Sequence, residues 1–250
     1  MKKLNNKVAL ITGGTNGMGL ASAQEFIHQG AKVIITGRNV TAMENALKVL
    51  GNNAFGLISD AGSMTDLQQL AKEIKQFTDK IDILFVNAGY GRFASIEATD
   101  EAFYDSLFNV ITKGTFFTVQ QILPLMPAGG SILLNTSVVT SSGMQNFSIY
   151  TAAKAAVQSF IKTFAAECTD KGIRVNGISP GYITTNIFNN TGLTQEQIEG
   201  TVAAITPTLP FKRFGKAEEI AKTALFLASD DASYIHGAEI AVDGGLAAIS

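Results

Sequence analysis

Short apolar runs rich in β-branched residues alternate with longer amphipathic segments along the whole chain. Each run is almost continuously apolar, which is typical of parallel strands covered on both faces. The segments between the runs, such as 18–29 and 66–77, repeat apolar residues at helical spacing. This alternation predicts an α/β fold, a Rossmann-like doubly wound parallel sheet of about seven strands with helices on both faces. The expected strands are 7–12, 32–36, 54–58, 82–86, 131–136, 173–178 and 239–242.

The composition excludes several classes of protein. Of the 250 residues, 46% are hydrophobic and 16% are charged, so a disordered chain is excluded and a core can form without disulfides or metal. The net charge of −2 offers no basic field for nucleic acid or an anionic membrane. The chain has one cysteine, Cys168, and two histidines, His28 and His236. These counts predict no internal disulfide and no metal site.

The alternation of expected strands and helices runs without interruption along the chain, which predicts a single domain. We find no linker, repeat or charge block, so we expect one catalytic domain over residues 1–250. No apolar stretch approaches the roughly 20 residues that cross a bilayer, and none forms a signal-peptide core, so a cytoplasmic location is expected. Residues 185–214 combine glycine, prolines and asparagines with apolar side chains, which indicates a lid over a substrate pocket.

A glycine-rich turn joins the first expected strand to the first expected helix and reads TGGTNGMG over residues 12–19. Glycine permits positive φ and a close approach of the backbone to a pyrophosphate. The N-terminus of the following helix attracts phosphate. At this junction the turn predicts a dinucleotide-binding site. The expected contacts come from Gly13, Thr15, Asn16, Gly17, Met18 and Gly19.

The choice between NAD and NADP is expected to depend on the end of the second strand. An acidic residue there binds the ribose 2′-hydroxyl of NAD, whereas an arginine accommodates the 2′-phosphate of NADP. Arg38 occupies this position and no carboxylate is present. Because a guanidinium binds phosphate in a fork geometry, NADP(H) is favoured over NAD(H).

Three polar residues further along the chain predict acid–base chemistry. Ser137 follows the fifth expected strand, and Tyr150 and Lys154 lie four residues apart on one helix face. A free tyrosine has a pKa of about 10 and is a poor acid or base at neutral pH. We expect the neighbouring ammonium of Lys154, together with the positive ring of an oxidised nicotinamide, to lower the pKa of Tyr150 and so allow general acid–base catalysis. Taken alone, the Tyr-x-x-x-Lys spacing is common and indicates only an ordinary helix face.

Together these motifs resemble the short-chain dehydrogenase/reductase family over essentially the whole chain. The family's cofactor turn appears in residues 12–19, its Asn-Ala-Gly motif in 87–89 and its closing signature in 243–245. Val86 stands where a second asparagine is usual, and Asn16 stands where NADP-preferring members often have a basic residue. The catalytic tetrad that the resemblance implies is Asn109, Ser137, Tyr150 and Lys154. The further cofactor contacts that it implies are Asp60, Ala61, Asn87, Ala88, Gly89, Tyr150, Lys154, Pro180, Gly181, Ile183 and Thr185.

The resemblance also implies a reaction and a role for each residue. Hydride is exchanged between a nicotinamide and a ketone or secondary alcohol. Ser137 donates a hydrogen bond to the carbonyl oxygen, and Tyr150 transfers the proton. Lys154 binds the ribose hydroxyls, the Ile183 backbone and the Thr185 hydroxyl hold the carboxamide, and Asn109 anchors a water.

The substrate is expected to be a small carbonyl compound with hydrophobic substituents, because the candidate pocket is mostly apolar. A carbonyl reductase is therefore favoured. The alternatives are a 3-oxoacyl-acyl-carrier-protein reductase, although 125–130 has no basic residues to dock an acidic carrier, and a non-catalytic dinucleotide sensor. A homo-oligomer, either dimer or tetramer, is expected through segments 100–123 and 148–168. The pocket candidates are Tyr90, Phe93, Val138, Val139, Gly143, Met144, Phe147, Tyr182, Ile187 and Phe188.

Overall fold

A seven-stranded parallel sheet organises the computed structural model, which describes residues 2–185 and 194–249. Its strands lie in the order β3-β2-β1-β4-β5-β6-β9, and all six neighbouring pairs are parallel. The strand order reverses between β1 and β4, which is where doubly wound folds bind ligands. The predicted fold is confirmed. The strands are β1 (Val8–Thr12), β2 (Lys32–Gly37), β3 (Ala54–Ile58), β4 (Ile83–Val86), β5 (Ser131–Asn135), β6 (Arg174–Pro180) and β9 (Glu239–Val242).

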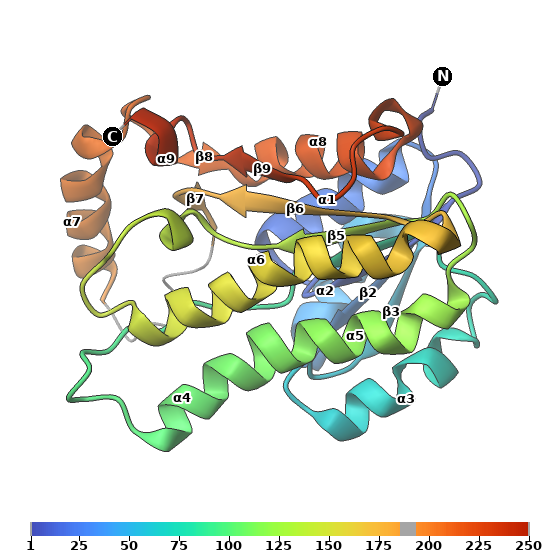
Figure 1. Ribbon diagram of the computed structural model, residues 1–250, viewed down its shortest axis with the longest axis horizontal. Coiled ribbons are helices and arrows are strands. Elements are labelled where there is room, and N and C mark those ends of the chain that lie inside the picture. The colour runs from blue at the N-terminus through green and yellow to red at the C-terminus, as the bar shows by residue number, and fades with distance from the viewer. Residues whose placement is uncertain (1, 186–193, 250) are drawn as a thin grey trace.

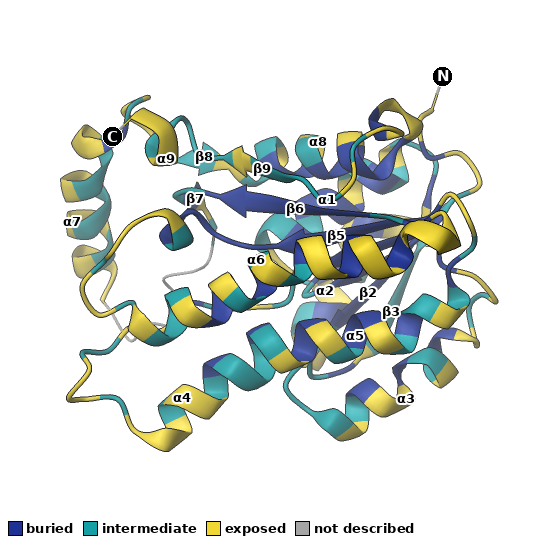
Figure 2. Cartoon of the chain, in the orientation of Figure 1, coloured by how far each residue is buried: buried dark blue, intermediate teal, exposed yellow. Residues whose placement is uncertain are grey.

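Two hydrophobic cores lie on the opposite faces of this sheet. Successive residues of β1 enter different cores, since Leu10 packs in one and Ala9 and Ile11 pack in the other. This is why each strand is continuously apolar, and Figure 2 shows the central strands buried while the helices are exposed on their outer sides. One face is covered by α1 (Gly17–His28), α2 (Val40–Leu50) and α8 (Ala217–Ala228). The other is covered by α3 (Met64–Ile74), α4 (Glu101–Phe108), α5 (Gly114–Ile122) and α6 (Ser148–Cys168).

The structure differs from the sequence-based elements in two places. The expected helix 100–123 is interrupted by a π-helical turn, Asn109–Lys113, between α4 and α5. A second, two-stranded parallel sheet pairs β7 (Ile183–Thr184) with β8 (Gly215–Lys216). Two residues are too few to produce a periodic signal in the sequence. In the sequence, α7 (Gln195–Ile205) lies between β7 and β8, and α9 (Leu246–Ile249) follows β9.

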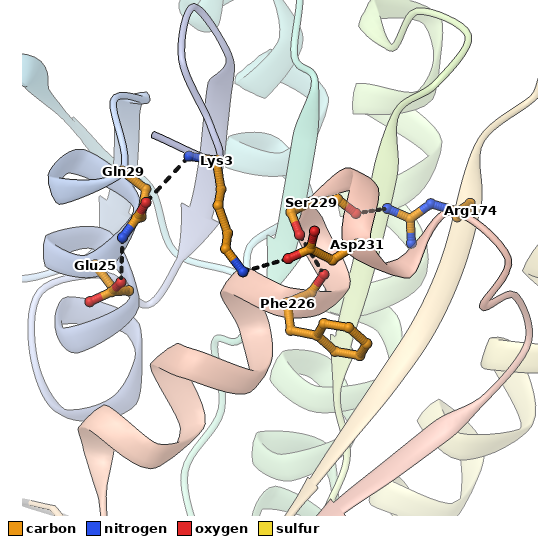
Figure 3. Close-up of polar contacts among 7 residues, drawn as sticks. All are labelled: Lys3, Glu25, Gln29, Arg174, Phe226, Ser229 and Asp231. Atoms are coloured by element: carbon orange, nitrogen blue, oxygen red, sulfur yellow. Dashed lines mark hydrogen bonds and ion pairs between the residues drawn. The ribbon is translucent and has the colours of Figure 1, made fainter. Parts of the chain in front are cut away.

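Polar contacts at the amino ends of the strands secure the N-terminal segment (Figure 3). The Lys3 backbone N–H donates to Gln29 Oε1 over 3.3 Å, and the Lys3 ammonium forms an ion pair with Asp231 after α8. At the start of β6, Arg174 Nη2 donates to the Ser229 carbonyl over 3.1 Å. The exposed Lys3–Asp231 ion pair contributes only about 0–1 kcal/mol to stability. These contacts serve stability, and the opposite, carboxyl ends of the strands remain available for a site.

Candidate active site

A large cavity of about 1330 Å³ opens at the carboxyl ends of the strands. The residues that follow β1, β2, β3, β4, β5 and β6 all line it, together with one face of α6. Sequence positions more than 160 residues apart thus meet in one place. Most predicted site residues line the cavity: Gly13, Thr15, Asn16, Gly17, Met18, Arg38, Asp60, Ala61, Asn87, Ala88, Gly89, Tyr90, Phe93, Ser137, Val138, Val139, Met144, Phe147, Tyr150, Lys154, Pro180, Gly181, Tyr182, Ile183 and Thr185.

Other predicted residues lie elsewhere. Gly19, Asn109 and Gly143 do not line the cavity. Ile187 and Phe188 lie outside the described residues. Among the residues that the structure describes, no group of three or more His, Cys, Asp or Glu side chains is suited to a metal ion. None of the described helices combines the length and hydropathy that a membrane span requires.

The glycine turn after β1 fits the pyrophosphate of a dinucleotide. Gly13 and Gly17 adopt positive φ values of 64° and 51°. A Cβ atom at Gly19 would lie 2.3 Å from the Gly13 carbonyl oxygen, so Gly19 is needed for packing within the turn. Asn16 caps α1 without a side-chain hydrogen bond, and the first turn of α1 has no acidic residue. The first-turn N–H groups of α1 therefore suit an anionic phosphate.

Asn87, directly after β4, fixes this turn in position. The Asn87 side chain donates to the carbonyl oxygens of Thr12 and Gly13 over 3.1 and 3.2 Å. The Thr12 hydroxyl in turn accepts from the backbone N–H groups of Asn87 and Ala88, each over 3.0 Å. Val86, the departure from the family motif, is buried in the core and leaves these contacts intact. The Asn-Ala-Gly motif therefore braces the cofactor turn from the neighbouring strand.

Asn135, the last residue of β5, was not among the site residues predicted from the sequence. It links Asn87 to Lys154 on α6. Its side-chain amide donates to Asn87 Oδ1 over 3.0 Å, and its backbone carbonyl accepts from Lys154 Nζ over 2.8 Å. A polar residue that ends an otherwise apolar strand was the available signal. Hydrogen bonds thus run from Lys154 through Asn135 and Asn87 to Gly13.

Arg38 lies at the end of β2 beside Asp60, which follows β3. The Arg38 Nη1 atom is 3.8 Å from Asp60 Oδ2, and the guanidinium lies 5.9 Å from the Tyr90 ring centroid. The Arg38 side chain is 66% exposed, so it is accessible to a ligand. Asp60 Oδ1 accepts from the Gly62 N–H, and the Asp60 N–H donates to Asp66, which holds the pKa of Asp66 below its ordinary value. The loop that carries Asp60 is therefore ordered by its own backbone contacts.

The nicotinamide end of the predicted cofactor site is closed by the segment after β6. The Gly181 N–H donates to the Val242 carbonyl over 3.1 Å, and a Cβ at Gly181 would lie 2.7 Å from Asp243 Cα. Glycine is therefore required for the close approach of the two strand ends. Thr185 packs against the cofactor turn, since a Cβ at Gly17 would lie 3.4 Å from the Thr185 Cβ.

Ser137, Tyr150 and Lys154 all line the cavity. The Ser137 side chain acts on Tyr150 in the direction that lowers the Tyr150 pKa. Lys154 is only 4% exposed, and its Nζ lies 6.0 Å from the Tyr150 ring centroid. Burial lowers the pKa of Lys154 to about 8. The three side chains therefore lie in one part of the cavity lining, where Ser137 and Tyr150 can donate to a carbonyl oxygen and Lys154 lies beside Tyr150.

In the chain by itself, Lys154 does not lower the pKa of Tyr150. Burial raises it above the ordinary value, and the hydrogen bond with Ser137 offsets this only in part. The low-polarity surroundings penalise the phenolate more than its neighbours stabilise it. In the chain itself Tyr150 is thus held in the protonated, proton-donating form.

Asn109 begins the π-helical turn, away from the cavity lining. Its side-chain oxygen accepts from Lys113 Nζ, and its carbonyl accepts from the Gly114 N–H. A Cβ at Gly114 would lie 2.4 Å from the Ala61 carbonyl oxygen, so α5 closely approaches the loop after β3. Such single π-turns are frequent at functional sites. The water-anchoring role of Asn109 stays a prediction.

Aromatic rings form the walls of the cavity around Tyr150. Phe93 and Phe147 stack with ring centroids 4.1 Å apart, and both meet the Tyr150 ring edge to face at 6.0 and 6.4 Å. Tyr182 and Phe214 form a second pair at 5.4 Å. Phe214 was missed because it lies in the irregular segment before β8, far from every motif. The cavity beside Tyr150 is therefore bounded by flat apolar surfaces.

Comparisons with known proteins agree with this geometry. A family model described as enoyl-(acyl carrier protein) reductase matches residues 13–247. The oxidoreductase asL5 of Sarocladium schorii is 36% identical over 251 residues, covering 100% of this chain and 99% of that protein. The 3-oxoacyl-[acyl-carrier-protein] reductase FabG of Thermotoga maritima is 34% identical, covering 98% and 99%.

A solved structure of a short-chain dehydrogenase/reductase family protein has a TM-score of 0.86 and 35% identity to this chain. The match covers 99% of this chain and 100% of the other. Sequence and fold therefore agree over the full length of the relatives. The chain belongs to the short-chain dehydrogenase/reductase family and is an oxidoreductase that acts on CH–OH or carbonyl groups.

Proposed function

We propose that this protein is an NADP(H)-dependent carbonyl reductase that interconverts a hydrophobic ketone and its secondary alcohol. The observation that carries the proposal is the meeting of Ser137, Tyr150 and Lys154 in the same cavity as the glycine turn and Arg38. When bound, the dinucleotide supplies the hydride. The same proposal assigns the enzyme to the cytoplasm as a homo-oligomer.

The side chains act on the carbonyl oxygen. Ser137 and Tyr150 donate hydrogen bonds to it, where negative charge grows in the transition state. Tyr150 carries its proton at neutral pH, and this proton passes to the oxygen during reduction. Lys154 remains largely charged at neutral pH because its pKa is about 8, and it orients the ribose.

The NADP(H) preference is proposed to depend on Arg38. Arg38→Ala is expected to lower kcat/KM for NADPH about 10- to 100-fold, because a charge-assisted hydrogen bond contributes about 1.5–3 kcal/mol. The kcat/KM for NADH should stay unchanged. Initial rates with both cofactors measure the effect, and Lys48→Ala, an exposed charge on α2, is the control. An equal loss of kcat/KM with both cofactors would contradict a role of Arg38 in binding the 2′-phosphate.

The Phe93–Phe147 pair beside Tyr150 favours a ketone that carries an aromatic ring. Aromatic pairs contribute about 0.5–1.5 kcal/mol beyond the burial of their area. We compare 2-tetralone with trans-2-decalone, which share a bicyclic skeleton but differ in one aromatic ring. The expected kcat/KM is about tenfold higher for 2-tetralone, and Phe93→Leu should reduce that preference. Equal values for both ketones would contradict the aromatic preference and leave the reductase proposal standing.

The second candidate is a 3-oxoacyl-acyl-carrier-protein reductase, since one relative carries that name. Turnover of acetoacetyl-carrier protein without turnover of either bicyclic ketone would favour it. NADPH binding with no turnover of any carbonyl substrate would favour the dinucleotide sensor. Both reductase reactions require the hydroxyl of Tyr150. Loss of turnover in Tyr150→Phe would therefore show that the measured activity comes from this site and not from a contaminating enzyme.

Residues 185–214 are proposed to form the substrate lid. Within the described part, Thr201 and Ile205 of α7 line the cavity, together with Thr208 and Phe214. Helix α7 has a complete capping box at Thr194 and Gln197, which gives it a defined start. A short ordered helix on one side of the cavity is a suitable wall for a substrate.

A further inference from the structure

A carboxylate on the edge strand β9 connects the two elements that carry the catalytic side chains. Glu239 accepts a hydrogen bond from the Thr136 hydroxyl through Oε1 and from Gln158 Nε2 through Oε2, the latter over 2.6 Å. Thr136 directly follows β5, and Gln158 lies on α6. Glu239 is therefore bonded to two elements that are distant from it in sequence.

Each of the two donors lies close in sequence to a proposed catalytic residue. Thr136 immediately precedes Ser137 and is only 2% exposed. Gln158 lies four residues after Lys154 and eight after Tyr150, so all three share one face of α6. The Thr136 N–H donates to the Ile178 carbonyl over 2.9 Å, and the Thr136 hydroxyl oxygen lies 2.9 Å from the same carbonyl, so its single proton is shared between the Ile178 carbonyl and Glu239 Oε1. The Ser137 end of β5 is thus held to β6, to β9 and, through Glu239, to the catalytic helix.

Two hydrogen-bonded ties join the end of β5 to α6. Lys154 Nζ donates to the backbone carbonyl of Asn135, and the Glu239 carboxylate joins Thr136 to Gln158. Gly177 leaves room for this arrangement, because a Cβ there would lie 2.2 Å from Ile161 Cδ1 on α6 and 3.5 Å from Glu239 Cγ. Helix α6 therefore lies close against β6 where Glu239 meets it.

We propose that Glu239 is a positioning residue, which holds Ser137 and Tyr150 in register for proton transfer. This inference rests on the proposed reductase function. Glu239 touches neither substrate nor cofactor in this proposal. Its effect should fall on kcat, because a misplacement of about 1 Å of a catalytic group can cost about 10²-fold in rate.

The test uses the intact enzyme, NADPH and 2-tetralone. Glu239→Ala is expected to lower kcat about tenfold and leave KM for NADPH unchanged, since the phosphate and glycine-turn contacts lie on β1, β2 and β3. Glu239→Gln should retain kcat within about threefold. Its amide oxygen can accept from Gln158, and its NH₂ can donate to the Thr136 oxygen, whose own proton is then donated wholly to the Ile178 carbonyl.

A reciprocal exchange provides the rescue. Gln158→Glu alone places two carboxylates against each other and should lower kcat about tenfold. Gln158→Glu combined with Glu239→Gln restores a donor–acceptor pair and should restore kcat. Glu167→Gln, an exposed position on the same helix, is the control. Melting temperatures of all variants report folding separately.

The outcomes are distinguishable. Loss of kcat in the two damaging variants with recovery in the double variant supports the positioning role. Values of kcat within twofold of wild type throughout would overturn it. A joint fall of kcat, NADPH affinity and melting temperature in both Glu239 variants would also overturn it, because the role would then be structural. Wild-type enzyme that turns over no ketone would instead contradict the proposed function.

Discussion

Replacement of Tyr150 by phenylalanine is expected to lower kcat about 10³-fold, because the proton donor is lost while the ring remains. The ring contacts with Phe93 and Phe147 need no hydroxyl, so the pocket should keep its shape. Initial rates of NADPH consumption with 2-tetralone measure the effect. NADPH binding, followed by fluorescence titration, should stay close to that of wild type.

Tyr104→Phe is the matched control for this experiment. Tyr104 stacks on Phe108 at the surface of α4 and is 42% exposed, away from the cavity. Its loss of a hydroxyl should leave kcat unchanged. Retained turnover in Tyr150→Phe would show that another group supplies the proton and would contradict the assignment of Tyr150.

Replacement of Lys154 by methionine has the second largest expected effect. The kcat should fall about 10²-fold, since the ammonium that orients the ribose and supports proton transfer is lost. The folded protein should tolerate the change at pH 7. Burial lowers the pKa of Lys154 from 10.5 to about 8, so keeping the charge costs on the order of 3 kcal/mol, and losing the Asn135 hydrogen bond costs about 1–3 kcal/mol.

The buried charge of Lys154 destabilises the folded wild type, whereas the Lys154 hydrogen bond stabilises it. The difference in stability between wild type and Lys154→Met should therefore depend on pH. Above pH 8 the folded wild type releases the Lys154 proton, whereas the unfolded chain holds it up to pH 10.5, so wild-type stability rises with pH across this window. Melting temperatures of wild type and Lys154→Met should therefore be similar at pH 7. The wild type should become the more stable protein toward pH 10. A constant difference from pH 7 to pH 10 would contradict the buried, weakly basic lysine.

Local motifs made much of the fold and site predictable. The glycine turn and the Tyr150–Lys154 spacing each lie within one strand–helix junction or one helix, so their geometry follows from neighbouring residues. Tertiary contacts decided the rest. Asn135 and Glu239 matter through partners on other strands, and a lone carboxylate in an edge strand is usually solvated. The direction of the Tyr150 pKa shift depends on burial, which a sequence does not display.

Strand β9 is the last strand in the sequence, yet it pairs with β6 and carries Glu239. A chain that emerges from the ribosome therefore exposes Ser137, Tyr150 and Lys154 well before residues 239–245 can complete the sheet and meet Gly181. Domains form as units during synthesis, and unpaired strand edges favour aggregation until they are covered. The catalytic groups are thus assembled only once β9 has been translated, so chains that stop short of residue 239 should carry the catalytic residues without the activity.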